Sequence, residues 1–194
     1  MSARRQRQMC IRDSNNVIGT AARFLPWKGW DKVIETAAKL RDLNLDFKLL
    51  LAGSDDENYK QKLENLVDVN NLNDYIVFEN HYENIEIFFE KIDLFLFLTE
   101  SEGFGLVVLE AIENNIPVVC SNIEPLSEFV ENSYKTLVNR ENTGEIANFV
   151  YKILNDDDLI KQIQLKQKNK IKKEFPITLS AEKHEKYYIN LLNN

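Results

Sequence analysis

Short stretches of consecutive apolar residues alternate along the chain with longer segments whose apolar residues recur every three to four positions. Stretches of the first kind predict β-strands, and segments of the second kind predict amphipathic α-helices. The predicted strands are residues 15–22, 46–53, 74–79, 93–99 and 116–121, with a weaker one at 134–138. The predicted helices are residues 28–44, 57–72, 83–92, 105–115, 124–131, 143–156, 157–175 and 179–192.

Helices between successive strands indicate βαβ units, in which the strands run parallel to one another. The stretch DLFLFLT at 93–99 is apolar on both faces, as expected for a strand covered by helices on both sides. We therefore predict a Rossmann-like, doubly wound α/β domain over residues 15–175, with a parallel sheet of about six strands. Pro176 separates this domain from a C-terminal amphipathic helix within residues 176–194. Sheets of this kind bind ligands beyond the carboxyl ends of their strands.

The composition is that of a globular domain, because 44% of the 194 residues are hydrophobic and 28% are charged. No apolar run is long enough to cross a membrane, and no apolar segment of a signal peptide follows the basic N-terminus. The net charge of −7 argues against a nucleic-acid partner. Cys10 and Cys120 lie far apart in the sequence, so we expect no disulfide and a reducing, cytoplasmic environment.

The first fourteen residues differ in character from the rest of the chain. The segment RRQRQMCIRDS, residues 4–14, is basic, has no hydrophobic periodicity and resembles the translation of a sequencing adapter. We expect residues 1–14 to be an artefact of that kind. We also expect that the natural protein continues further toward the N-terminus.

The segment ESEGFGLVVLE, residues 100–110, is the first candidate site. Gly103 and Gly105 lie where the strand at 93–99 gives way to a helix, and glycine lets the backbone approach a ligand closely. The helix begins near Leu106, and the free N–H groups of a helix start favour an anion such as phosphate. The sequence therefore predicts a phosphate-binding turn at this position.

Two acids and two cations complete the candidate site. Glu110 lies about one turn into that helix, where its carboxylate suits the paired hydroxyls of a ribose, and Glu102 precedes the glycines, where it suits a second polyol. Arg23 and Lys28 follow the first predicted strand. A diphosphate leaving group develops negative charge as its bond to a sugar breaks, and two fixed cations would stabilise that charge. His81, after the third strand, is a further candidate on the side of the base.

Three segments together resemble the C-terminal, donor-binding domain of a retaining glycosyltransferase of the GT-B fold, family 4, also named group 1. They are ARFLPWKGW at 22–30, LLLAG at 49–53 and DLFLFLTESEGFGLVVLEAIENNIPVV at 93–119. The two acids of the family's E-x7-E motif correspond to Glu102 and Glu110, and its Arg and Lys correspond to Arg23 and Lys28. The resemblance covers most of residues 16–192.

The resemblance implies a nucleotide-sugar donor, most often a UDP-sugar, and transfer with retention by front-face attack, with no metal and no cofactor. It implies that Arg23 and Lys28 hold the diphosphate, that Glu110 holds the ribose and that Glu102 lies near the donor sugar. The backbone amides of Phe104, Gly105, Leu106 and Val107 would meet sugar and phosphate. An N-terminal domain outside this chain would bind a glycan or lipid-linked acceptor for surface polysaccharide or lipopolysaccharide assembly. The enzyme would be cytoplasmic, with peripheral association at the inner face of the membrane as a further expectation, and this fragment alone would be inactive.

The chain departs from the family's pattern in three loops. The sequence reads Gly53-Ser54-Asp55 where the family often has G-x-G, and it has Asn80 and Ile116 where glycines are common. These loops border the base and phosphate, so the identity of the nucleotide stays open. Two other functions also stay open, a non-catalytic nucleotide-binding module and a GT-B-fold epimerase acting on nucleotide sugars.

Overall fold

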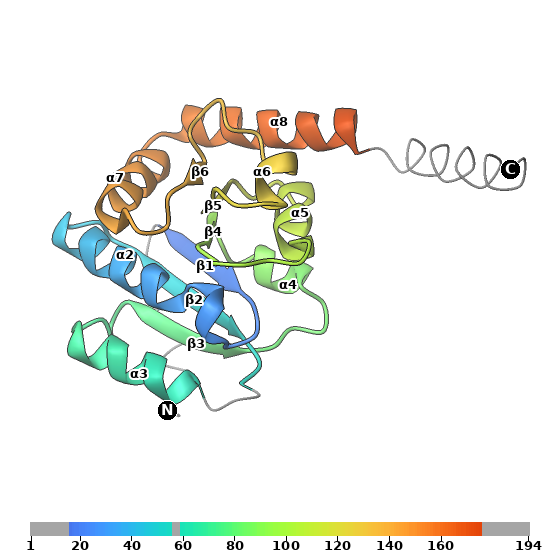
Figure 1. Ribbon diagram of the computed structural model, residues 1–194. Coiled ribbons are helices and arrows are strands. Elements are labelled where there is room, and N and C mark those ends of the chain that lie inside the picture. The colour runs from blue at the N-terminus through green and yellow to red at the C-terminus, as the bar shows by residue number, and fades with distance from the viewer. Residues whose placement is uncertain (1–15, 56–58, 176–194) are drawn as a thin grey trace, which may run out of the picture.

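Residues 16–55 and 59–175, which the computed structural model describes, form a parallel sheet of six strands in the order β3-β2-β1-β4-β5-β6 (Figure 1). The strands are β1 (Val17–Ala21), β2 (Lys48–Gly53), β3 (Ile76–Asn80), β4 (Leu94–Phe97), β5 (Val118–Ser121) and β6 (Leu137–Val138). The chain runs outward from β1 to β3 and then returns to β4, which lies on the other side of β1. The predicted Rossmann-like, doubly wound sheet is therefore confirmed, with its switch point between β1 and β4.

The helices alternate with the strands as predicted. They are the 3-10 turn η1 (Pro26–Lys28), α2 (Trp30–Asp42), α3 (Lys60–Val69), α4 (Glu86–Phe89), α5 (Leu106–Glu113), α6 (Leu126–Phe129), α7 (Thr143–Leu154) and α8 (Asp157–Glu174). Each α-helix is shorter than the segment predicted for it. Helix α2 begins two residues late because Gly29 adopts a left-handed conformation, and α4 is a single turn. The expected artefact at residues 1–14 and the expected C-terminal helix lie outside the described residues.

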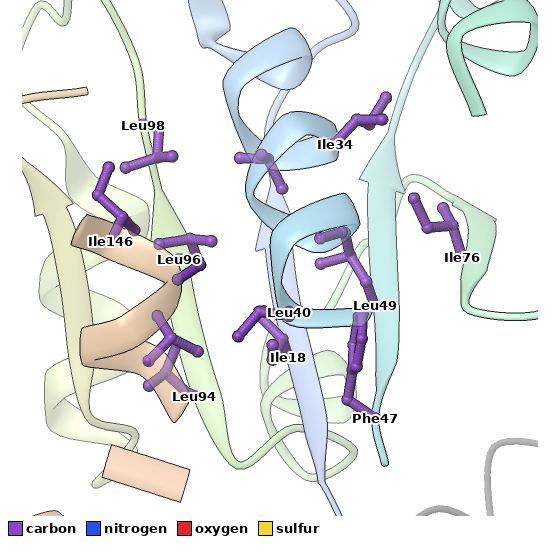
Figure 2. Close-up of a cluster of buried hydrophobic side chains, with 14 of the residues drawn as sticks. Ile18, Ile34, Leu40, Phe47, Leu49, Ile76, Leu94, Leu96, Leu98 and Ile146 are labelled. Carbon is purple, nitrogen blue, oxygen red and sulfur yellow. The ribbon is translucent and has the colours of Figure 1, made fainter. Parts of the chain in front are cut away.

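One apolar layer lies between the sheet and helices α2, α3 and α7. Figure 2 shows Ile34 and Leu40 of α2 over the sheet residues Ile18 and Leu49, with Ile146 of α7 beside β4. These five side chains are nearly inaccessible to solvent. The burial of each contributes about 1.5–3 kcal/mol to folding.

The opposite face of the sheet is covered by α4, α5 and α6, with an aromatic centre. Phe89 of α4 meets Phe95 of β4 edge to face at 5.9 Å, and Phe95 stacks on Phe97 at 5.8 Å. Every residue of β1, β4 and β5 is buried, which confirms the prediction that the apolar strands are covered on both faces.

Helix α8 joins the two layers and runs across the top of the molecule in Figure 1. Its residue Ile163 belongs to the first layer and Ile171 to the second. Between them, the buried side-chain amide of Gln167 accepts a hydrogen bond from the N–H of Val118 at 3.0 Å and donates one to its carbonyl at 2.8 Å. Strand β6 pairs with β5 only from Cys120 onward, so Gln167 takes the place of a neighbouring strand at the start of β5.

The lysine-rich segment of α8, residues 166–173, also takes part in packing. Gln167 and Ile171 are buried, and Lys168 donates hydrogen bonds to the carbonyl of Glu113 at 3.0 Å and to the side chain of Asn115 at 2.7 Å. These contacts hold α8 against the end of α5. None of the helices in the described part of the chain combines the length and apolar character needed to span a bilayer.

Candidate nucleotide-sugar site

The loops that follow β1 and β4 meet at the switch point of the sheet. The carbonyl of Trp27, in η1, accepts hydrogen bonds from the N–H of Glu100 at 2.8 Å and from the hydroxyl of Thr99 at 3.0 Å. Glu100 and Thr99 open the loop between β4 and α5. One backbone and one side-chain hydrogen bond thus connect the two segments that the sequence singled out.

Gly29 explains how η1 fits so closely against β4. Its φ is +72°, and a Cβ atom at this position would lie 1.8 Å from the carbonyl oxygen of Leu98. Only glycine allows both the left-handed conformation and this approach. The residue therefore ends η1, begins α2 and places Lys28 directly beside the loop after β4.

The backbone of Arg23 is held in place by Trp30 and Phe24, and not by contacts of the Arg23 side chain. Its carbonyl accepts a hydrogen bond from the indole N–H of Trp30 at 3.1 Å, and the neighbouring Phe24 packs against the Trp30 ring at 4.7 Å. Trp30 and Phe24 are buried, whereas Arg23 is exposed. The backbone is therefore fixed while the guanidinium faces solvent.

Lys28 and Glu102 form an ion pair in which the ammonium nitrogen lies 2.7 Å from one carboxylate oxygen. The two side chains are only 13% and 15% exposed. The other carboxylate oxygen of Glu102 accepts a hydrogen bond from the N–H of Gly103 at 3.0 Å. The sequence assigned Lys28 to a diphosphate and Glu102 to a sugar, and the structure places the two side chains in direct contact.

The Gly-Phe-Gly turn leads into α5 as the sequence predicted. Gly105 has a φ of +84° and precedes the first helical residue, Leu106, whose exposed fraction is 62%. A Cβ atom on Gly105 would lie 2.4 Å from Leu126 in α6, whereas one on Gly103 would have no other atom within 4 Å. The N–H groups of Leu106 and Val107 come too early in α5 to have a partner within the helix and lie at this turn. The N–H of Val108 donates a hydrogen bond to the carbonyl of Gly105 at 2.9 Å.

A surface cleft of about 350 Å³ lies at the carboxyl ends of the strands. It brings together Arg23, His81, Val107 and Glu110 from three separate segments of the chain. Its volume is within the range of small-ligand sites. The other predicted site residues do not line this cleft. They form the neighbouring Lys28–Glu102 pair and the turn at residues 103–106.

Tyr82 is a cleft residue that the sequence analysis missed. Its hydroxyl donates a hydrogen bond to the carboxylate of Glu79 and accepts one from Lys91 at 2.5 Å, and its ring packs against Phe88 at 5.6 Å. Partial burial raises the pKa of Tyr82 above its ordinary value, and the hydrogen bond to Glu79 raises this pKa further. The signal in the sequence was its position next to His81, directly after a strand.

Arg140 is a second residue that no sequence motif singled out. It lies between β6 and α7, is 15% exposed, and pairs with Glu100 at 3.2 Å, Glu141 at 3.3 Å and Asp31 at 3.9 Å. Ion pairs with such exposed carboxylates contribute roughly 0–1 kcal/mol. Arg140 therefore contributes little to stability, but it links the loop after β4 to the start of α2 and so helps to orient the two segments.

Within residues 16–55 and 59–175, no group of three or more His, Cys, Asp or Glu side chains is arranged to hold a metal ion. The charged groups at the site include the two cations Arg23 and Lys28 and the three acids Glu83, Glu102 and Glu110.

Comparison with known proteins agrees with this architecture. Over residues 3–180 the sequence matches the family described as Glycosyl transferases group 1. The O-antigen biosynthesis glycosyltransferase WclY of Escherichia coli is 29% identical over 196 residues, which cover 96% of this chain and 50% of WclY. The capsular polysaccharide biosynthesis glycosyltransferase CapM of Staphylococcus aureus is 27% identical over 182 residues, 93% of this chain and 47% of CapM. The chain spans about half the length of these curated relatives.

Among solved structures, HepE of Anabaena in complex with UDP and glucose has a TM-score of 0.83 at 21% identity, over 97% of this chain and 52% of HepE. This likeness concerns the fold, whereas the sequence match over residues 3–180 concerns the family. The chain belongs to the glycosyl transferases group 1 family, and it has the fold of the C-terminal half of a GT-B glycosyltransferase.

Proposed function

We propose that this chain is the donor-binding half of a retaining, metal-independent glycosyltransferase that takes its sugar from a nucleotide sugar, in the first place a UDP-sugar. The observation that carries the proposal is the cleft at the switch point, where Arg23, His81 and Glu110 meet in a chain of this family. Doubly wound sheets bind nucleotides at this place. The HepE structure with UDP and glucose supports the choice of nucleotide.

Each predicted residue has a role in this proposal. Glu110 accepts hydrogen bonds from the two ribose hydroxyls, and His81 borders the base. Arg23 and Lys28 hold the diphosphate, Arg23 as a planar fork and Lys28 as a point charge. The backbone N–H groups from Gly103 to Val107, at the start of α5, meet the phosphate and the sugar.

Chemistry at the site follows from the charge that develops on the leaving group. The bond between the sugar C1 and the diphosphate oxygen breaks, and the acceptor oxygen bonds to C1 on the same face, so the configuration is retained. The proton of the acceptor hydroxyl passes to the departing phosphate oxygen. Arg23 and Lys28 stabilise the diphosphate as its charge grows, while Glu102 lies near the donor sugar. A charge pair at about 4 Å and an effective dielectric near 20 contributes roughly 4 kcal/mol before desolvation.

The acceptor and the biological setting belong to the whole protein. WclY and CapM, which are about twice as long as the matched segment, are described as enzymes of O-antigen and capsular polysaccharide biosynthesis. We infer that the full protein transfers a sugar to a glycan or lipid-linked acceptor in surface polysaccharide assembly, at the inner face of the cytoplasmic membrane. The acceptor site lies in the half that this chain does not include, so the chain alone transfers no sugar.

The proposal is tested by thermal-shift titrations of the full 194-residue chain with UDP, ADP and GDP. A ligand that binds only the folded state raises stability by RT ln(1 + [L]/Kd). We expect UDP to raise the Tm of the wild type and of Glu113→Ala, and to raise it much less for Glu110→Ala. Glu110 and Glu113 are exposed on the same helix, but only Glu110 lines the cleft. A folded chain whose Tm responds to none of the three nucleotides contradicts the proposal.

A further inference from the structure

Three phenylalanines connect the Gly-Phe-Gly turn to the end of α8. The ring of Phe104, in the turn, lies 6.0 Å from the ring of Phe129 in α6. Phe129 in turn meets Phe175, which follows the last residue of α8, edge to face at 6.4 Å. Phe129 is 2% exposed, whereas Phe104 and Phe175 are 53% and 45% exposed. Phe129 is thus the buried centre of a row that reaches the surface at both ends.

The turn itself rests on α6. A Cβ atom on Gly105 would lie 2.4 Å from Leu126 and 3.3 Å from Phe129, so the backbone of the turn touches both side chains. Glycines on each side of Phe104 leave the turn without neighbouring side chains that could hold it. The ring of Phe104 therefore supplies the aromatic contact of the turn with α6, while the Glu102 carboxylate holds the N–H of Gly103.

Helix α8 is fastened to the same element from the other side. The Lys170 ammonium donates a hydrogen bond to the carbonyl of Val130, at the end of α6, at 3.2 Å. Ile171 packs in the same apolar layer as Phe129, and the N–H of Phe175 closes the helix on the carbonyl of Ile171 at 2.9 Å. The position of Phe175 is thus set by α8, and that of Phe129 by both helices.

We propose that Phe129 and Phe175 are positioning residues that hold the Gly-Phe-Gly turn where its N–H groups meet the diphosphate of the donor. The inference rests on the proposed nucleotide-sugar function and adds two residues to it, neither of which lines the cleft. Phe104 transmits their position to the start of α5 through Gly105, the residue between Phe104 and the helix. Truncation of Phe175 removes one ring contact of Phe129, so the turn can adopt a wider range of positions. This weakens the contacts of the turn with phosphate and leaves the contacts with the nucleoside unchanged.

Affinities of the full chain for UDP and for UMP provide the test, because only UDP carries the second phosphate. We expect Phe175→Ala and Phe129→Leu to weaken UDP binding about two- to tenfold, the range open to one aromatic pair, and UMP binding less than twofold. Leu165→Ala, at a 61% exposed position of α8, is the matched control and changes neither affinity. Far-UV circular dichroism verifies that each variant is folded, and the half-exposed Phe175 keeps the test open if Phe129→Leu is unstable.

Two outcomes overturn the inference while leaving the proposed function in place. Unchanged UDP affinity in a folded Phe175→Ala variant shows that the row of rings does not position the turn. Equal loss of UDP and UMP binding shows a general structural effect. A folded wild type that binds neither nucleotide overturns the proposed function and the inference with it.

Discussion

Lys28 and Glu102 lie 74 positions apart in the sequence and form an ion pair of 2.7 Å at the switch point of the sheet. Both side chains are mostly buried, and Glu102 is further held by the N–H of Gly103. In the proposed mechanism the same ammonium group serves the diphosphate. Phosphate and the Glu102 carboxylate therefore compete for Lys28. When the donor binds, Glu102 shares its positive partner with the diphosphate, and the donor sugar comes to lie beside it.

Removal of the negative charge of Glu102 should therefore strengthen binding of UDP. We expect Glu102→Gln to raise UDP affinity about two- to fivefold, since a partly exposed pair contributes up to about 1 kcal/mol, and Lys28→Ala to lower it at least tenfold. Isothermal titration calorimetry of both variants measures the two effects. If Glu102→Gln weakens UDP as much as Lys28→Ala does, the pair acts as one positioning unit rather than as two competitors.

The two glycines of the turn should respond differently to alanine. Gly105→Ala introduces a left-handed alanine and a contact of 2.4 Å with Leu126, so we expect a loss of about 2 kcal/mol or more in the free energy of unfolding. Gly103→Ala meets no atom within 4 Å, and its stability should change by less than about 0.5 kcal/mol. Urea denaturation measures both.

Nucleotide binding separates a structural role of Gly103 from a functional one. In the proposed site the turn backbone approaches the ligand, so Gly103→Ala should weaken UDP binding without a change in unfolding free energy. Equal UDP affinity for Gly103→Ala and wild type would show that the ligand does not approach this residue.

The sequence was a good guide to the elements and to the separate loops, but not to the contacts between distant residues. Strand β4 and helix α2 were predictable because the burial of their side chains follows local periodicity. Arg23 and Glu110 were predictable as candidates because each lies at a strand end or helix start, and the structure places both at one cleft. Tyr82, which lines the same cleft, was missed because its hydrogen bonds to Glu79 and Lys91 arise only after the loop is folded.

Helix α8 shows why burial cannot always be predicted from the local sequence. Periodicity predicted a helix, but five of the eight residues at 166–173 are lysines, which are mostly exposed in proteins, and nothing in this composition indicates a buried amide. The amide of Gln167 is buried because β6 is too short to pair with the start of β5, a property of another element 30 residues earlier in the chain. No local pattern carries that information.

Gln167 should be more important for stability than any other polar residue of α8. Its replacement by leucine leaves the N–H and the carbonyl of Val118 without partners in a buried position, and each unsatisfied group costs about 1–3 kcal/mol. We expect Gln167→Leu to lower the free energy of unfolding by about 2–4 kcal/mol in urea denaturation. Gln164→Leu, one turn earlier, removes a single surface hydrogen bond to Asn115 and should cost less than about 1 kcal/mol.

Asp93 should make the stability of the fold depend on pH. Its carboxylate accepts a hydrogen bond from the N–H of Val17 at 2.7 Å. The two residues lie at the amino ends of β4 and β1, whereas the candidate site lies at the carboxyl ends of the strands. Partial burial raises the pKa of Asp93 above 3.8, and the bond from Val17 opposes this only in part. Because the folded-state pKa is the higher one, the contribution of Asp93 to stability is fully present below the unfolded-state pKa and is lost as the pH rises through the folded-state pKa.

Asparagine at this position keeps a hydrogen-bond acceptor for Val17 and does not ionise. The difference in unfolding free energy between Asp93→Asn and wild type should therefore shift in favour of the variant as the pH is raised from about 3 to 7. Urea denaturation at a series of pH values measures this difference directly. A difference that is constant with pH, or that shifts toward the wild type, would mean that the bond from Val17 outweighs burial and that the ionised carboxylate is the form the fold prefers.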